Sequence, residues 1–328
     1  MLTSLHINNF RGLRDLKIEP LKRVNLITGQ NNTGKTGVLE ALVLLLSEAA
    51  PNQNLRNQLP NLFRTVGGDY HENYWKWLFF GKDVSKHIEI KGSFDNAKEL
   101  QFHVKPNGWR AGEQQPAQLR HSGQIGNSPC FLSGNGDSAG LKPAVFSTHP
   151  SNPTQDAVDY QRVVLKRRKK QVEKLLREIE PRLEAVEALR IGDQNSSPSL
   201  IYADLGLSEM IPVTQLGQGF NRLLDIYSEI VVEDAKVLLI DEIENGLHHS
   251  VMPVIWKGLF LAAKEFDVQI FATTHSWECI LAADEAARAG EKYDLALIRL
   301  DRVKEDIKAT VIDEKSLSTA KELQWEMR

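Results

Sequence analysis

The stretch Gly29-Gln30-Asn31-Asn32-Thr33-Gly34-Lys35-Thr36 decides the fold of this chain, because it matches the pattern G-x-x-x-x-G-K-[ST]. An apolar, strand-like run at residues 24–27 precedes it, and an apolar, helix-like run at residues 36–50 follows it. Glycines in such a loop let several backbone N–H groups point at one phosphate group, and the N-terminus of the following helix adds partial positive charge. The stretch therefore predicts a phosphate-binding loop, here called the P-loop.

Two side chains of the P-loop carry the predicted chemistry. Lys35 is expected to reach the β- and γ-phosphates of ATP, and the Thr36 hydroxyl is expected to ligate Mg²⁺. Gly29, Asn31, Asn32, Thr33 and Gly34 complete the predicted binding loop. From average residue frequencies, a chance match to this pattern in a chain of this length is on the order of one per cent.

A second apolar strand supplies two adjacent acids. Residues 237–240 are followed at once by Asp241 and Glu242. We expect Asp241 to hold Mg²⁺ through water and Glu242 to polarise the attacking water. His275 follows the next apolar strand, at residues 268–272, so a parallel sheet places it at the same edge. A strand that ends in two acids is weak evidence alone, but after a P-loop it predicts a catalytic site containing Lys35, Glu242 and His275.

The order of elements predicts an α/β fold with mixed sheets. Residues 1–105 alternate as short strands around one apolar helix, with a hairpin turn at Asp95-Asn96. After residue 215 strands and helices alternate, which favours a parallel sheet with crossover helices. We therefore expect an N-terminal ATPase lobe at residues 1–105, an inserted loop-rich and helical lobe at residues 106–215, and a C-terminal ATPase lobe at residues 216–328.

The insertion is predicted to begin with loops, apart from a short strand at residues 144–146, and to continue as a helical stretch at residues 159–190. Four- and three-residue spacings within that stretch give a short heptad seam of Val172, Leu176, Ile179, Leu183 and Val186. The alternative is an ordinary amphipathic helix packed on its own domain. Pro181 predicts a kink or a break.

The segment Gly217-Gln218-Gly219 lies just before a helix predicted to end near Val232. Its glycines expose backbone N–H groups at a helix start, which is a second anion-binding geometry. A second phosphate cradle has a use if it serves the nucleotide of another subunit. A simple helix N-cap turn is the alternative.

The motifs as a set resemble those of ABC-type ATPase heads of the RecF, SMC and OLD (overcoming lysogenization defect) kind. They occur in the same order: Phe10-Arg11-Gly12-Leu13, the P-loop, Gly217–Gly219, residues 241–248 and Thr274-His275-Ser276. The chain is most similar to the OLD-like group of bacterial AAA-family ATPases, often found in phage-defence systems.

The resemblance spans nearly the whole chain and implies a P-loop ABC-type ATPase head. It implies a head-to-tail homodimer with two ATP molecules, each sandwiched between one P-loop and the signature Gly217–Gly219 of the other subunit. It also implies that Arg11 belongs to the nucleotide site, that residues 244–247 cross the dimer and that His275 is the switch histidine.

Three departures from the family pattern matter. Gly217 stands where the signature serine is usual. The stretch between P-loop and signature is too short for a long coiled-coil arm, which argues against a DNA-bridging role. The chain ends at Arg328, so we expect none of the Toprim nuclease that follows the ATPase in many OLD proteins.

Composition bounds the partners. The formal net charge is −3, less basic than a dedicated nucleic-acid binder usually is, so nucleic-acid binding would need a local patch. The main positive run is Lys166 to Lys170; a solvated helix face and a phosphate contact are both open. No secretory signal or membrane-length apolar run is found, so we expect a cytoplasmic protein without a membrane partner.

Two functions stay open. The first is an ATP-driven dimeric switch that controls a separate effector, a nuclease or toxin, in defence against phage. The second is a RecF-like repair or clamp protein in which ATP gates DNA binding. A P-loop kinase is disfavoured, because a signature and a switch histidine have no use there.

Overall fold

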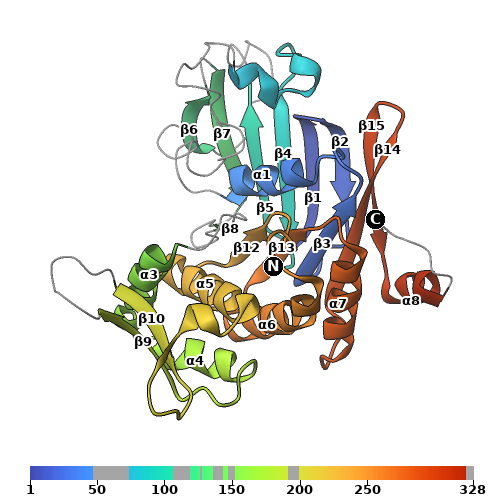
Figure 1. Cartoon of the computed structure of the whole chain (residues 1–328). Helices are drawn as coiled ribbons and strands as arrows, with labels where there is room; N and C mark the ends of the chain where they lie inside the picture. The colour runs from blue at the N-terminus through green and yellow to red at the C-terminus, as the bar shows by residue number, and fades with distance from the viewer. Residues whose placement is uncertain are drawn as a thin grey trace.

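The computed structural model of the chain describes residues 1–46, 74–105, 119–125, 128–135, 143–146, 152–190 and 199–322. These residues form an α/β fold with two six-stranded sheets and a smaller three-stranded sheet (Figure 1). The two larger sheets lie on either side of one apolar helix, and further helices cover the outer face of the second sheet.

The first sheet is antiparallel, with strand order β2-β1-β4-β5-β7-β6. Its strands are β1 (Leu2–Phe10), β2 (Leu13–Ile18), β4 (Ile88–Phe94), β5 (Glu99–Val104), β6 (Leu119–Ile125) and β7 (Ser128–Asn135). The predicted hairpin is confirmed, since β4 and β5 pair around Asp95-Asn96. The prediction of loops was wrong at β6 and β7, because pairing holds their polar, glycine-containing sequences as strands: β7 pairs with β5, and β6 pairs with β7.

The second sheet has the order β15-β14-β3-β13-β12-β8. Its strands are β3 (Val24–Gly29), β8 (Pro143–Phe146), β12 (Val237–Ile240), β13 (Gln269–Thr273), β14 (Leu295–Val303) and β15 (Asp306–Ile312). All neighbouring pairs are parallel except β14 with β15. The predicted parallel sheet and the short strand at β8 are confirmed. This sheet combines strands from all three predicted ranges: β3 from residues 1–105, β8 from residues 106–215, and the other four from residues 216–328. The division of the chain at residues 105 and 215 therefore stays a proposal.

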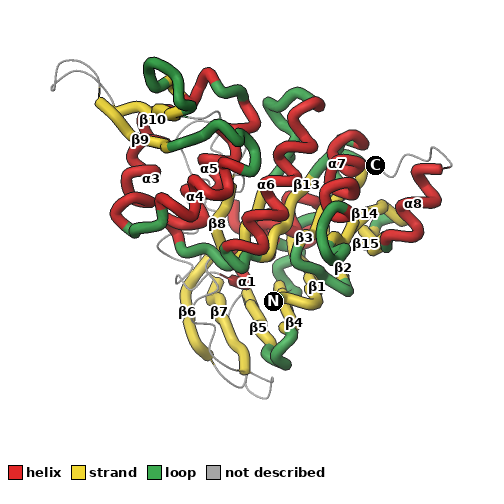
Figure 2. The backbone as a smooth tube through the Cα atoms, turned by 90° about the horizontal axis from the view of Figure 1, so that it is seen from below, coloured by secondary structure: helices red, strands yellow, loops and turns green. Residues whose placement is uncertain are grey.

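Helix α1 (Lys35–Leu46) lies between the two large sheets. It is apolar on every face, and such a helix is stable only when buried all round. The opposite face of the parallel sheet is covered by α5 (Gln218–Glu233), α6 (Met252–Glu265) and α7 (Trp277–Arg288), while α8 (Glu314–Glu322) follows β15 (Figure 2).

The range predicted as an inserted lobe also contains α3 (Pro153–Leu165), α4 (Lys169–Arg177), and an antiparallel sheet of β9 (Ala185–Arg190), β10 (Ser199–Asp204) and β11 (Ile211–Pro212). The prediction of helix through residues 159–190 is therefore confirmed over residues 159–165 and 169–177 and was wrong at β9. The helix is interrupted at Arg167, which has a φ of 58°. The second helix, α4, ends at Arg177, before Pro181. Val186 belongs to β9, whose pairing with β10 overrides the helix-forming composition.

The heptad seam consequently does not exist as one surface. Val172 and Leu176 are buried on α4, in the same core as α5 and α6. This matches the alternative of ordinary helix packing. Within the described ranges, no helix has both the length and the apolar character needed to cross a bilayer.

Candidate functional site

The P-loop joins β3 to α1, as its sequence predicts. Gly34 has a φ of 85° and Asn32 a φ of 62°, so the loop curls through the left-handed region. At Gly29 a side chain would collide with the backbone: its Cβ would lie 2.4 Å from the carbonyl oxygen of Leu300. The Thr33 hydroxyl donates to the carbonyl of Gln30 at 2.9 Å and closes the loop.

Lys35 is buried beneath this loop. Its Nζ donates to the carbonyl of Gly29 at 2.8 Å and to that of Gln30 at 2.9 Å. Burial lowers the pKa of Lys35, and the nearby carboxylates of Asp241, Glu242 and Glu244 counter that shift. The ammonium group therefore stands where anions attract it and where little water competes.

Thr36 and Asp241 meet across the two motifs. The Thr36 hydroxyl donates to Oδ2 of Asp241 at 2.9 Å, although the residues are 205 positions apart. One hydroxyl and one carboxylate, with room for phosphate oxygens, are the hard oxygen ligands that Mg²⁺ takes in nucleotide sites. The donor set therefore fits Mg²⁺.

Glu242 and His275 stand beside this pair. Glu242 is exposed and has a φ of 47°, a strained conformation for a residue other than glycine. The side-chain amide of Asn245 donates to its Oε2 at 3.4 Å. The backbone N–H of His275 donates to Oε1 of Glu244 at 2.6 Å, which ties the loop after β12 to the loop after β13.

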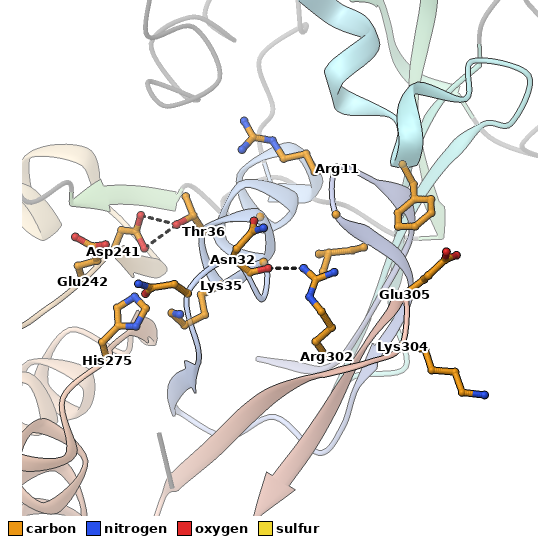
Figure 3. Close-up of a pocket in the computed structure, with 16 residues that line it drawn as sticks. Arg11, Asn32, Lys35, Thr36, Asp241, Glu242, His275, Arg302, Lys304 and Glu305 are labelled. Atoms are coloured by element: carbon orange, nitrogen blue, oxygen red, sulfur yellow. Dashed lines mark hydrogen bonds between the residues drawn. The ribbon is translucent and has the colours of Figure 1, made fainter. Parts of the chain in front are cut away.

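A cavity of about 810 Å³ contains most of the predicted site. Its lining includes Arg11, Asn31, Asn32, Gly34, Lys35, Thr36, Asp241, Glu242 and His275. Gly29 and Thr33 lie outside its lining and shape the loop from behind. In Figure 3, Asp241, Glu242 and His275 lie on one side of the P-loop residues, and Arg302, Lys304 and Glu305 on the other.

Sequence reasoning missed seven lining residues: Gly12, Leu13, Gly37, Phe80, Arg302, Lys304 and Glu305. The last three reach the cavity because β14 pairs with β3, with Leu300 opposite Gly29, so β14 runs on past the P-loop. The sequence around residues 302–305 reads only as a charged turn after a strand, so nothing in it predicts that these residues lie beside the P-loop. Phe80, on the 3₁₀ turn Phe80–Lys82, had a signal, since it belongs to an aromatic cluster in the sequence.

Arg11 is held by an acid of α1. Its guanidinium contacts Oε2 of Glu40 at 2.6 Å at the wall of the cavity. Burial raises the pKa of Glu40 to about 7 and outweighs the opposing attraction of Arg11. The contact with Glu40 therefore holds the Arg11 side chain in place at the cavity wall.

The signature segment lies apart from this cavity. Gly217, Gln218 and Gly219 begin α5 and are absent from the lining. Gly217 has a φ of 92°, a conformation that serine would adopt only with strain, which explains the departure from the family pattern. Gly217 and Gln218 are exposed, whereas Gly219 packs against Val251.

The fold neutralises part of the basic run at residues 166–170 and the lysine that follows it at position 174. Lys166 contacts Asp234 at 2.9 Å, Lys169 contacts Glu187, and Lys174 contacts Glu265 at 2.9 Å. Paired cations have less charge to offer a nucleic-acid backbone. This arrangement favours a solvated helix face.

Comparison with known proteins agrees with this geometry. The chain is 26% identical over 333 residues to an ATP/GTP phosphatase of Helicobacter pylori, with 88% of this chain and 89% of the relative covered. A DNA replication and repair protein RecF of Nitrosococcus oceani is 48% identical over 44 residues, 13% of this chain and 12% of RecF.

Among solved structures, an SMC head bound to the C-winged helix domain of ScpA aligns with a TM-score of 0.58 at 14% identity, covering 97% of this chain and 99% of that one. The fold is thus that of an SMC-head-like P-loop ATPase domain. A family model described as "AAA domain, putative AbiEii toxin, Type IV TA system" matches residues 24–280. Since that match spans well over half of the chain, the protein belongs to this AAA-domain ATPase family.

Proposed function

We propose that this protein is a nucleoside triphosphatase that works as a nucleotide-driven dimeric switch. The observation that carries the proposal is the meeting of Thr36 and Asp241 at 2.9 Å on the wall of one cavity that also contains Lys35. The P-loop, the two expected metal ligands and Glu242 come from segments far apart in the sequence, and all of them line the same cavity.

The chemistry assigned to the site is hydrolysis of the γ-phosphate. Lys35 leaves its carbonyl partners for the phosphates, and Glu242 polarises the water that attacks the γ-phosphorus. The bond from that phosphorus to the β–γ bridging oxygen breaks, and ADP and phosphate leave. His275 lines the same cavity as Glu242 and is assigned to the γ-phosphate as well. Mg²⁺, held by Thr36 and Asp241, would neutralise charge on the β- and γ-phosphates.

The remaining end of the cavity is assigned to the nucleoside. Phe80 lines it, and the Arg14 guanidinium lies 4.8 Å from the centre of the Phe80 ring. Arg302, Lys304 and Glu305 are exposed, so water competes for their hydrogen bonds and little base selectivity is expected from them. Hydrolysis of both ATP and GTP is therefore part of the proposal, and the name of the Helicobacter pylori relative supports it.

The proposed output is control of a separate effector, a nuclease or toxin in phage defence, by an ATP-sandwiched homodimer in the cytoplasm. The exposed signature Gly217-Gln218, outside its own cavity, supports a contact with the nucleotide of a second copy. The family description, with its AbiEii toxin and type IV TA system, supports the defence setting.

Lys35→Ala tests the nucleotide function. Calorimetry should show loss of ATP and GTP binding, and turnover should disappear, while circular dichroism stays that of the wild type. Unchanged affinity together with unchanged turnover would refute the assignment of the site.

A RecF-like DNA-binding protein is the second candidate, and the short match to RecF supports it. The two functions differ in a simple measurement. Salt-dependent DNA binding by the isolated protein favours the RecF-like function. Co-purification with the product of a neighbouring gene, without DNA affinity, favours the effector switch.

A further inference from the structure

The hydroxyl of Thr273 lies between the two adjacent acids of the site. Thr273 ends β13 and is fully buried. Its Oγ1 donates to Oδ1 of Asp241 at 2.6 Å and accepts from the backbone N–H of Glu242 at 2.7 Å. A single side-chain group thus contacts the expected metal ligand and the residue expected to polarise water.

The sheet register produces this contact. Strands β12 and β13 are parallel with Ile240 opposite Ala272, so Asp241 and Thr273 follow as neighbours at the carboxyl edge. The main chain adds a third bond, because the N–H of Ile243 donates to the carbonyl of Thr273 at 3.0 Å. Together these bonds hold the turn in which Glu242 takes its strained φ of 47°.

The two oxygens of Asp241 are shared between two threonines. Oδ1 receives the Thr273 hydroxyl at 2.6 Å, and the Thr36 hydroxyl lies nearer to Oδ2, at 2.9 Å, than to Oδ1, at 3.3 Å. With Oδ1 held from the buried side, Oδ2 is presented toward the P-loop. Partners of this kind orient metal ligands, and their loss typically costs 10–100-fold in metal affinity or activity.

We propose that Thr273 is a positioning residue for nucleotide hydrolysis, through which one hydroxyl sets both the Asp241 carboxylate and the backbone of Glu242. The proposal rests on the proposed function. A threonine that only satisfies its own buried hydroxyl would affect stability but would leave the Mg²⁺ dependence and kcat of the folded protein unchanged.

Thr273→Val keeps the shape of the side chain and removes the hydroxyl. In the full-length chain it should raise the Mg²⁺ concentration for half-maximal ATP hydrolysis roughly 10-fold or more, and lower kcat by about 10–100-fold. Binding of a fluorescent ATP analogue in EDTA should stay within about twofold of wild type, because the P-loop is intact. Thr273→Ser, which restores the hydroxyl, should recover most of kcat and of the Mg²⁺ response.

Thr274→Val is the matched control. Thr274 is equally buried, and its hydroxyl accepts from the N–H of Ser276 at 3.0 Å. It should lose stability comparably while its Mg²⁺ response stays near wild type. If Thr273→Val does not fold, Thr273→Ala is measured in its place.

A wild-type Mg²⁺ response and kcat in folded Thr273→Val would overturn the proposal, and so would a Thr273→Ser variant as impaired as the valine variant. Either result leaves the nucleotide function standing if Lys35→Ala still abolishes binding. Failure of the wild-type chain to bind any nucleoside triphosphate would instead remove the proposed function itself.

Discussion

The guanidinium of Arg302 donates to the carbonyl of Asn32 at 2.7 Å, so the far end of β14 holds the P-loop from outside (Figure 3). The residues are 270 positions apart and meet because β14 and β3 are parallel neighbours. Asn32 has a φ of 62°, and a fixed carbonyl stabilises that conformation.

Arg302→Ala should therefore weaken nucleotide binding while turnover at saturation changes little. Arg302 is exposed, so its bond is given the typical net value of about 1 kcal/mol, which corresponds to a roughly fivefold loss of affinity. Isothermal titration with ATP measures it. Arg299→Ala is the control, since Arg299 lies on the same strand and pairs with Asp301 outside the cavity lining. Equal losses in both variants would contradict a specific role for Arg302.

Phe80→Ala tests the nucleoside end of the cavity. Removal of a stacking ring should lower affinity for ATP and GTP alike by roughly 5–100-fold. Affinity for inorganic tripolyphosphate, which has no base, should not change. Trp77→Ala, in the neighbouring 3₁₀ turn Tyr74–Leu78, removes a 58% exposed aromatic side chain outside the cavity lining and should have no effect. A tripolyphosphate loss as large as the ATP loss would show that Phe80 shapes the P-loop instead.

Glu242→Gln should separate binding from hydrolysis. The amide keeps the size of the side chain but polarises water poorly, so single-turnover hydrolysis should slow by roughly 10²–10⁴-fold. Affinity for ATP with Mg²⁺ should remain, because Thr36 and Asp241 are untouched. Near-normal turnover would place the base on another residue.

Asp225 on α5 predicts a pH dependence of stability. Burial raises the pKa of this carboxyl to about 8; Asp156 and Asp159 add to the shift, and Arg222 opposes it. The folded state therefore keeps a proton that the unfolded state loses near pH 4, so this group's contribution to stability falls as pH rises from about 4 to 8.

Asp225→Asn removes that titration. The Tm of the variant relative to wild type should rise between pH 5 and pH 8 and then level off, as followed by circular dichroism melts. Glu291→Gln, at a side chain that is 89% exposed, should shift Tm equally at all pH values. A constant difference for Asp225→Asn would mean that its carboxyl is ionised in the folded protein throughout.

The predictable parts of the site are those formed by short, continuous sequence motifs. The P-loop and the strand ending in Asp241 and Glu242 each carry a local pattern, and their placement at one sheet edge follows from parallel topology. Arg302 was not predictable in this way, since its position depends on which strand lies beside β3.

The wrong prediction of a long helix has a related cause. Ala185–Arg190 reads as helix in isolation and becomes β9 because β10 is available to pair with it. Arg167, at a positive φ, ends the first helix without glycine or proline to mark the break. Local composition predicts neither that β10 pairs with residues 185–190 nor that Arg167 takes a positive φ.

The predicted sandwich dimer requires a signature variant that leaves its own subunit intact. Gly219 is unsuitable, since an added Cβ would lie 2.5 Å from Cγ1 of Val251. Gln218 is exposed at the start of α5, where an acidic side chain is compatible with the helix dipole. Gln218→Glu should therefore fold normally but repel the triphosphate of a partner.

Mixing Lys35→Ala with Gln218→Glu then distinguishes composite sites from sites within one subunit. In a head-to-tail dimer, one mixed site contains both lesions and the other contains neither. An equal mixture of two inactive variants should recover about a quarter of wild-type turnover, because half of the dimers are mixed and each has one intact site. Lys35→Ala mixed with Thr36→Ala should recover nothing, since both lesions lie in P-loops and every site keeps one. If tagged subunits demonstrably form mixed dimers and the first mixture stays inactive, the signature does not complete the partner's site independently. A wild-type chain that remains monomeric with trapped ATP yet hydrolyses it fully would exclude the sandwich directly.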